Sequence, residues 1–343
     1  MMTKFNALLF LVSLLIITSC GSNTPKDEVK NDQQEDQVVS EKEKEFKAIN
    51  EQLKNDVNNA TLYLKRANLY KKYGDLTSAV GDVDRAIKVD STLPAFYLLK
   101  AELLKSQNNL KESKLALDKC LQIDNGNVTA RVELGWLALI VMNHKQALDY
   151  ADAALKRNVY SAEAYYLKGM IFQDKGDTTL AISSFITATE QESNYYDAYI
   201  QLGLLNMPID LKLAKGYLKN ALDLKPKSLE ALYAYAVCSQ EKEEYDEAIE
   251  TYHTILSIDA YKEPFFNLGF IHQEFLENYD VAIENYTKAI NLEPTYFEAY
   301  YNRAKCYELI DEPKLAEADY RAALKINPTY DYAAIALDKL LKK

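Results

Sequence analysis

Small residues recur along this chain with a period close to 34 residues. The first such column is Ala67, Ala101, Gly135, Gly169, Gly203, Ala236, Gly269 and Ala304. Two further columns begin at Ala79 and Ala86, and larger apolar residues lie between them at helical spacing, including Phe185, Leu218, Tyr252, Tyr286 and Tyr320. This pattern predicts a tandem array in which each repeat is a pair of antiparallel helices of about fourteen residues.

The small residues are expected to lie where the two helices of a repeat cross. Helix axes approach to about 8–10 Å only where the side chains between them are small, and the larger residues then fill the space beside the crossing. Gly74 and Gly176 fall between two predicted helices, where glycine can take the left-handed conformation that ends a helix. Pro226, Pro294 and Pro328 fall between repeats, where proline stops a helix.

Two segments carry a resemblance to a known family. Residues 162–169 read AEAYYLKG at the start of one repeat, and residues 320–328 read YRAALKINP at the end of another. In these segments and in its period, the chain resembles a tetratricopeptide-repeat (TPR) protein. The resemblance implies an all-α fold, a right-handed α-solenoid or superhelix of helix-turn-helix repeats. Eight repeats follow from it: 60–93, 94–127, 128–161, 162–195, 196–228, 229–261, 262–296 and 297–330.

The repeats are predicted to be flanked by two further helices and to contain one irregular turn. We expect an N-terminal helix over residues 46–59 and a C-terminal capping helix over residues 331–343, which covers the last apolar face. In repeat five one residue is missing between the helices, and Pro208 predicts an early end to the first of them. The change is either loop variation or a bend that shapes the binding surface.

The N-terminus resembles a bacterial lipoprotein signal peptide. Residues 1–19 combine one positive charge with an apolar run that is too short to span a membrane, and Ile17-Thr18-Ser19-Cys20 resembles a lipobox. The resemblance implies that Cys20 is acylated, with palmitate among the expected modifications, and that the protein is anchored in the cell envelope. Gly21 favours the outer membrane by the same resemblance, with the periplasmic or surface face left open. Residues 20–45 are predicted to be a disordered polar tether.

Charge and motifs narrow the class of function. The formal net charge of −11 argues against nucleic acid as a partner. After lipidation of Cys20, Cys120, Cys238 and Cys306 are expected to be buried free thiols. The sequence contains no HExxH, CxxC, phosphate-cradling glycine loop or nucleophile elbow. We therefore predict no catalytic residues, no metal site and no cofactor; a carboxylate-based enzyme is the weakest alternative.

The resemblance places ligands on the concave face, at the second, fifth, ninth and twelfth positions of each first helix. The ninth positions of repeats three to seven are five apolar residues in a row, and together with apolar and aromatic fifth positions they form an apolar stripe, which we predict to be a protein-binding groove. An acidic rim follows at the second position. The groove residues are Val132, Trp136, Leu139, Ile140, Tyr166, Met170, Ile200, Leu204, Tyr233, Val237, Phe266, Phe270 and Tyr301, and the rim residues are Glu163, Asp197, Glu230, Glu263 and Glu298.

These observations favour a non-catalytic, lipid-anchored scaffold of the bacterial envelope. It would bind apolar or amphipathic segments of other envelope proteins in the acid-rimmed groove. Two alternatives stay open: a structural subunit of an envelope machine for outer-membrane protein assembly, secretion or motility, and a regulator of peptidoglycan hydrolases. The sequence names neither the partner nor the oligomeric state, and an apolar stripe can also be packing between first helices.

Overall fold

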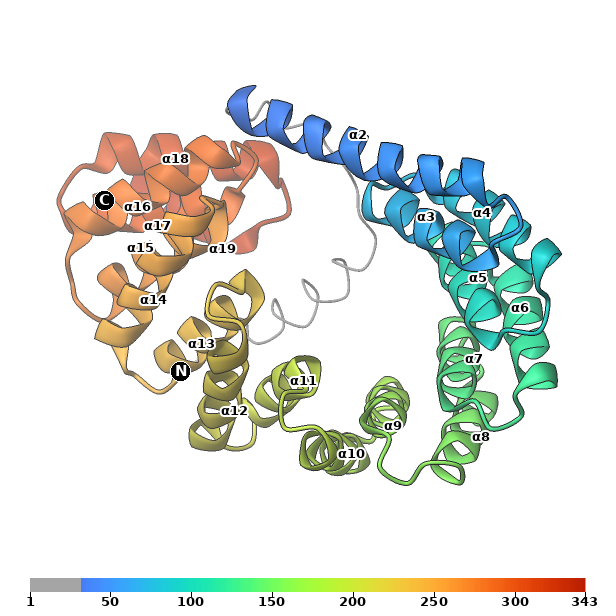
Figure 1. Cartoon of the computed structure of the whole chain (residues 1–343). Helices are drawn as coiled ribbons and strands as arrows, with labels where there is room; N and C mark the ends of the chain where they lie inside the picture. The colour runs from blue at the N-terminus through green and yellow to red at the C-terminus, as the bar shows by residue number, and fades with distance from the viewer. Residues whose placement is uncertain (1–31, 343) are drawn as a thin grey trace. The chain divides into compact units, whose positions relative to one another are not determined.

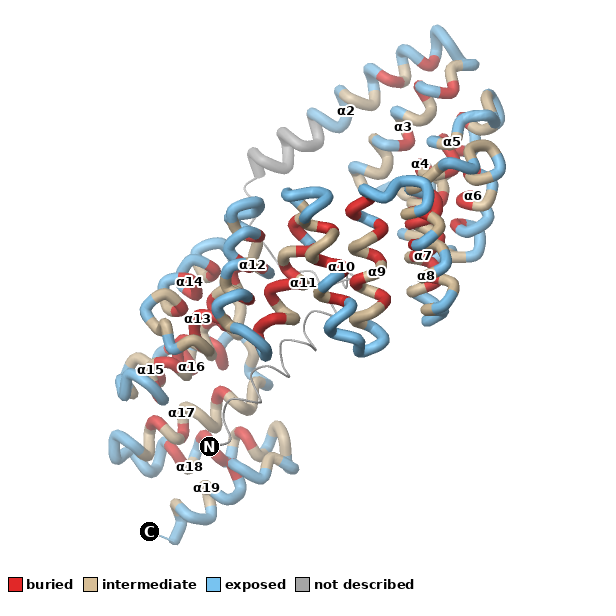
Figure 2. Tube along the Cα trace, turned by 90° about the horizontal axis from the view of Figure 1, so that it is seen from below, coloured by how far each residue is buried: buried red, intermediate tan, exposed pale blue. Residues whose placement is uncertain are grey.

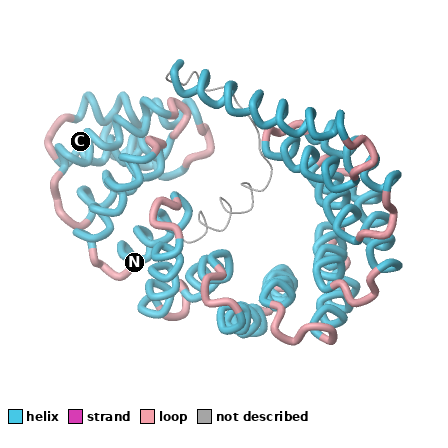
Figure 3. The backbone as a smooth tube through the Cα atoms, in the orientation of Figure 1, coloured by secondary structure: helices cyan, strands magenta, loops and turns pink. Residues whose placement is uncertain are grey.

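The computed structural model describes residues 32–342, with side chains from residue 41 onward. Over this range the fold is all-helical, with 18 helices and no strand, and consecutive helices pack in pairs (Figures 1 and 3). The described residues divide into two compact units, one that ends at Tyr195 and one that begins at Tyr196.

The N-terminal unit contains a lone helix and four helix pairs. The lone helix is α2 (Asp32–Asn55), and it packs on α3. The pairs are α3 (Ala60–Lys72) with α4 (Leu76–Val89), α5 (Pro94–Ser106) with α6 (Leu110–Ile123), α7 (Val128–Ile140) with α8 (His144–Leu155), and α9 (Ala162–Asp174) with α10 (Thr178–Gln191).

The C-terminal unit contains four pairs and a final helix. The pairs are α11 (Tyr196–Asn206) with α12 (Leu211–Leu224), α13 (Leu229–Glu241) with α14 (Tyr245–Ile258), α15 (Lys262–Glu274) with α16 (Tyr279–Leu292), and α17 (Phe297–Leu309) with α18 (Pro313–Ile326). The final helix, α19 (Asp331–Leu341), packs on α18.

The cores lie between the paired helices, where buried segments face each other (Figure 2). The residues of the first small column, from Ala67 to Ala304, are buried in every pair. At Gly169 the approach is so close that a Cβ atom would lie 2.4 Å from the ring of Phe185. Small residues at the crossings and large residues beside them are therefore what joins each pair, as the sequence predicts.

Seven of the eight turns within the pairs contain a residue with positive φ, the exception being the turn between α11 and α12. Gly74 and Gly176 have φ of 80° and 77°, as predicted. The equivalent turns carry non-glycine residues with positive φ: Asn108, Met142, Glu243, Glu277 and Asp311. The next residues then begin the second helix, usually with an Asp or Asn side chain that accepts a backbone N–H, as Asp177 does from Leu180 at 3.1 Å.

The first repeat and the last repeat each contain an ion pair between their own two helices. The guanidinium of Arg66 donates to both carboxylate oxygens of Asp82 at 2.5 and 2.8 Å, and Arg303 donates to Asp319 at 2.7 and 2.9 Å. All four side chains are largely buried. Arg66 also donates to Asn50 of α2, so the pair in the first repeat ties the N-terminal helix to the stack.

The structure differs from expectation at the N-terminus. Helix α2 begins at Asp32, inside the segment predicted to be a disordered tether over residues 20–45, and ends at Asn55 rather than at residue 59. Glu, Gln and Lys dominate this stretch and are strong helix formers, and residues Phe46, Ile49 and Leu53 give it an apolar face to dock on α3. Helix α11 ends at Asn206, two residues before Pro208, as predicted.

Replacing Met142 with glycine is expected to stabilise the protein. A left-handed conformation costs a non-glycine residue about 1–2 kcal/mol in the folded state, and glycine avoids this cost. Glycine also increases the conformational entropy of the unfolded chain, which offsets part of the benefit, so we expect the free energy of unfolding to rise by about 0.5–1 kcal/mol. Urea denaturation of wild type and Met142→Gly measures the difference. Gly176→Ala, the opposite change at the equivalent position of the next repeat, should lose a similar amount. A loss in the first variant or a gain in the second would show that the left-handed turns are not strained by a side chain.

Candidate interaction surface

The exposed parts of the first helices supply the candidate site. Three pairs of neighbouring first helices contact one another directly: α7 with α9, α11 with α13, and α15 with α17. Side chains at the second, fifth, ninth and twelfth positions therefore adjoin across each of these pairs.

In the N-terminal unit the predicted groove residues form one cluster on α7 and α9. Trp136 and Leu139 of α7 are half-buried, and Ile140 is 52% exposed. The rings of Trp136 and Tyr166 lie 5.9 Å apart, centroid to centroid, and Met170 is half-buried one turn further along α9. We call these five residues the α7–α9 patch.

Ring contacts behind Tyr166 fix the position of the α7–α9 patch. The ring of Tyr166 lies 5.3 Å from that of Phe185 on α10 and 5.1 Å from that of Tyr195 in the turn that follows. Such tilted ring pairs stabilise the folded state by more than the apolar area that they bury. Trp136 therefore rests on a Tyr that is itself fixed by two rings, which presents an ordered apolar surface.

The turn after α7 extends the apolar surface. Val141 and Met142 are 60% and 65% exposed, so three consecutive large apolar residues reach solvent from Ile140 onward. Met142 also holds the positive φ described above, which is unfavourable for its side chain. The sequence pattern did not include these two residues, because they lie outside the helical positions that were compared.

In the C-terminal unit the fifth-position rings mainly join successive repeats. Each is half-buried and contacts one ring on its own second helix and one in the next turn, and Tyr301 also contacts Tyr332 of α19 at 6.4 Å. The ring pairs are Tyr233 with Tyr252 and Tyr261, Phe266 with Tyr286 and Tyr296, and Tyr301 with Tyr320 and Tyr330, at 5.0 to 6.4 Å. Leu204 and Phe270 are also half-buried.

Three predicted groove residues are core residues. Val132 is 5% exposed, Ile200 is 1% exposed and Val237 is 5% exposed. Their assignment to the groove is wrong, because these aliphatic side chains lie between packed helices and leave no surface for a ligand. A short β-branched residue at the fifth or ninth position of these first helices is therefore buried and is not available to a ligand.

The predicted acidic rim lies at helix N-termini. Glu163, Asp197, Glu230, Glu263 and Glu298 each occupy the first turn of a first helix, where a carboxylate interacts favourably with the helix dipole. Desolvation and the neighbouring Asp197 carboxylate raise the pKa of Glu230, and desolvation raises the pKa of Glu298. Lys225 near Glu230 and Lys262 near Glu298 offset only part of this rise in pKa, so a further cation placed beside either carboxylate would stabilise its ionised form.

A buried hydrogen-bond network links repeats six and seven. The amide of Asn267 donates to the phenol oxygens of Tyr233 and Tyr252 at 3.1 and 2.9 Å, and Tyr252 donates to Gln240 at 3.2 Å. Burial raises the pKa of Tyr252 well above its usual value. Sequence reasoning treated Tyr252 as an apolar filler; the polar residue in the next repeat, Asn267, is the signal that could have revealed its partner.

Reactive side chains do not gather in the described part of the chain. No group of three or more His, Cys, Asp or Glu side chains could hold a metal ion within residues 32–342. Cys120, Cys238 and Cys306 are buried free thiols, as predicted, and burial raises the pKa of Cys120 and Cys238 to about 11. A thiol with a raised pKa is a weak nucleophile at neutral pH.

The predicted signal peptide over residues 1–19 and the lipidation site at Cys20 lie outside the described residues. Among the helices that are described, none combines the length and the hydropathy that a membrane span requires.

Comparisons with known proteins concern the repeats. Models of the tetratricopeptide repeat match residues 94–127, 162–195, 210–261 and 297–330, and a model of the TPR repeat matches residues 276–310. The TPR repeat-containing protein MJ1428 of Methanocaldococcus jannaschii is 25% identical over 234 residues, which are 64% of this chain and 35% of that protein. This chain therefore spans about a third of the length of the curated relative it matches.

Three solved structures share the fold. A chain of the APC/C hetero-tetramer Cut9-Hcn1 is 19% identical with a TM-score of 0.52, and the match covers 83% of this chain and 56% of that chain. The C-terminal part of a TPR repeat-containing protein from Cytophaga hutchinsonii is 17% identical with a TM-score of 0.59, covering 69% and 98%. For pilF of Pseudomonas aeruginosa the identity is 19% and the TM-score 0.54, covering 62% and 97%.

Proposed function

Because this chain is a tetratricopeptide-repeat protein, we propose that it is a non-catalytic scaffold that binds an amphipathic segment of another protein at the α7–α9 patch. Proteins built from this repeat generally mediate protein–protein interaction, and no enzymatic family is indicated by the matches. We further propose that a lipid on Cys20 holds the scaffold at the bacterial cell envelope.

The exposed apolar surface of the α7–α9 patch carries the proposal. Ile140, at 52% exposed, and the two exposed turn residues after it stand beside the half-buried Trp136 and Met170. Contiguous exposed apolar surface is unfavourable in water and usually marks a binding site, and Trp and Met are enriched at such sites. The ring contact between Trp136 and Tyr166 orders this surface before a partner arrives, which lowers the entropy cost of binding.

The charge beside the patch suggests the chemistry of the partner. Glu163 is exposed in the first turn of α9, the helix that carries Tyr166 and Met170. A bound segment with an apolar face and a Lys or Arg at its edge would complement both features. Acidic first turns also recur within the C-terminal unit, on α11, α13, α15 and α17.

The envelope part of the proposal depends on the N-terminal sequence. The apolar run that ends in Ile17-Thr18-Ser19-Cys20 has the order of a lipoprotein signal, and Gly21 after the cysteine favours the outer membrane. Several acyl chains on one cysteine would give a stable anchor where a single chain would not.

We expect a double Ile140→Glu, Met142→Glu variant to lose partners that wild type retains. Both side chains are exposed, so the charges should leave folding intact while placing two desolvated carboxylates in the interface, with a loss of binding of about tenfold or more. Crosslinking in intact cells followed by mass spectrometry would identify the proteins that disappear.

The matched control is Ile209→Glu, Leu213→Glu, which charges two exposed apolar residues around the turn of repeat five. It should keep the partners that the first variant loses. Partners that survive the patch variant would exclude this surface as the site. A complex of fixed stoichiometry that neither variant disturbs would favour the alternative, a structural subunit of an envelope machine.

The lipid anchor makes a separate prediction. The N-terminal peptide of the mature protein should begin at Cys20 and carry the mass of a diacylglycerol and an acyl chain, and Cys20→Ala should abolish this peptide and retain residues 1–19. Mass spectrometry of the membrane fraction measures both. Cys120→Ala, which removes a buried thiol, should leave the lipid in place. An unmodified Cys20 in the wild-type protein would refute the anchor and leave the binding proposal standing.

A further inference from the structure

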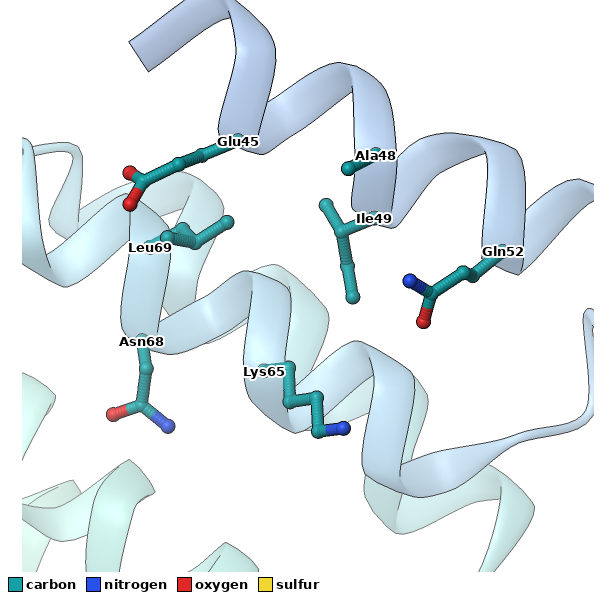
Figure 4. A pocket seen from close by; sticks show the side chains of 7 residues that line it. All are labelled: Glu45, Ala48, Ile49, Gln52, Lys65, Asn68 and Leu69. Carbon is teal, nitrogen blue, oxygen red and sulfur yellow. The ribbon is translucent and has the colours of Figure 1, made fainter. Parts of the chain in front are cut away.

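A cleft lies between α2 and α3, apart from the α7–α9 patch (Figure 4). Its volume is about 450 Å³. Ala48 and Ile49 of α2 and Leu69 of α3 form its apolar surface, and Lys65 and Asn68 of α3 line the same cleft with polar groups.

The repeat period explains why this cleft is open. Within the first repeat, three apolar residues of α4 are fully buried in the core that α4 forms with α3. Counting back 34 residues from these three, Ala79, Val83 and Ala86, gives Glu45, Ile49 and Gln52, all of which line the cleft. Helix α2 therefore holds the place of a second helix, and the cleft lies where the first helix of its pair would pack.

The chain itself does not fold back to fill this place between residues 32 and 44. The same period puts a turn at Ser40, 34 residues before Gly74, but α2 continues as one helix through this point. The described residues before Glu45 thus extend away along the axis of α2 instead of forming a paired helix.

The exposure of Leu69 shows what the missing helix would cover. Its equivalents in the next three repeats are Leu103, Leu137 and Ile171, and all three are buried in core clusters that include residues of the preceding helix pair. Leu69 is half-buried. An incoming helix would remove the rest of this side chain from water, which is the driving force for helix-in-groove binding.

Charges at the equivalent positions indicate what the incoming helix carries. Glu133, two repeats after Lys65, accepts a hydrogen bond at 2.5 Å from Lys105, at the twelfth position of the preceding first helix. Lys71, also at a twelfth position, pairs with Glu102 of the first helix that follows. In the cleft the charge at this position has the opposite sign, because Lys65 occupies the repeat position that Glu133 occupies in repeat three. Lys65 forms no ion pair with any other described residue.

We propose that the α2–α3 cleft binds one amphipathic helix of another protein, packed on Ala48 and Leu69 with a carboxylate at its twelfth position directed to Lys65. The occupant is a helix because α2 holds the place of a second helix, and α4, α6, α8 and α10, the other second helices of this unit, each pack against a first helix that precedes them in the chain. This surface lies on other helices than the patch, so the proposal is independent of the proposed function.

The probe is a stapled helical peptide with the sequence of residues 296–311, with its cysteine replaced by alanine. It is a first helix of the same repeat, with Ala304 at the crossing and Glu308 at the twelfth position. A second peptide carries Glu308→Lys. The staple preforms the helix, because an isolated helix of this length is marginal in water. Fluorescence anisotropy measures the affinity of each peptide for the full chain.

Wild-type protein should bind the Glu308 peptide about threefold more tightly than the Glu308→Lys peptide, as a partly exposed ion pair allows. Lys65→Glu should invert this preference. Lys47→Glu makes the same charge change on the opposite, exposed face of α2 and should leave the preference as in wild type. Ala48→Arg fills the cleft and should weaken both peptides by about tenfold or more.

Three results would overturn the proposal. No binding at about 1 mM peptide would mean that the cleft is closed to an incoming helix. An unchanged preference in Lys65→Glu would remove the role of the carboxylate. A dimer of the full chain, seen by sedimentation velocity and lost in Ala48→Arg, would identify the occupant as a second copy instead of another protein. The patch variant Ile140→Glu, Met142→Glu should bind the peptides as wild type does.

Discussion

The close crossing of the two helices in each repeat is the constraint on which the rest of the structure depends. A Cβ atom would lie 2.4 Å from the Phe185 ring at Gly169 and 2.5 Å from Leu218 at Gly203. Glycine inside a helix costs about 1 kcal/mol relative to alanine, yet it stands at these crossings because a large side chain of the second helix already fills the space. Local helix propensity is sacrificed so that the second-helix residue packs directly against the first-helix backbone.

The surface follows from this packing. Rings on the second helices lie beneath the first helices and contact the fifth-position rings, as Phe185 contacts Tyr166. The fifth positions therefore join repeats, and the exposed apolar surface moves to the ninth and thirteenth positions of α7, at Trp136 and Ile140, and to the turn beyond them. The same stacking leaves an open position beside α2, because no first helix precedes α2 within the described residues 32–342.

Periodicity predicted the helices, the buried columns and the left-handed turns at Gly74 and Gly176, because these depend on sequence neighbours and on one local crossing. It did not predict which groove positions reach solvent. Val132 and Val237 are buried by neighbouring helices whose exact rotation a one-dimensional pattern does not contain. The Tyr252 network was missed for a related reason, since Asn267 meets it only across a repeat boundary. The early start of helix α2 at Asp32 was not predicted, because the polar composition of residues 20–45 was interpreted as disorder.

The role of the crossing is tested most directly by the coupling between Gly169 and Phe185, measured by urea denaturation of Gly169→Ala, Phe185→Leu and the double variant. Gly169→Ala alone should destabilise the protein by about 1–3 kcal/mol, because the added methyl group overlaps the ring by more than helix propensity repays. With Phe185→Leu the methyl group gains room, so the double variant should be more stable than the sum of the single effects predicts, by about 1 kcal/mol or more. Additive effects, or a Gly169→Ala variant that is stabilised, would contradict the claim that the crossing determines the fold.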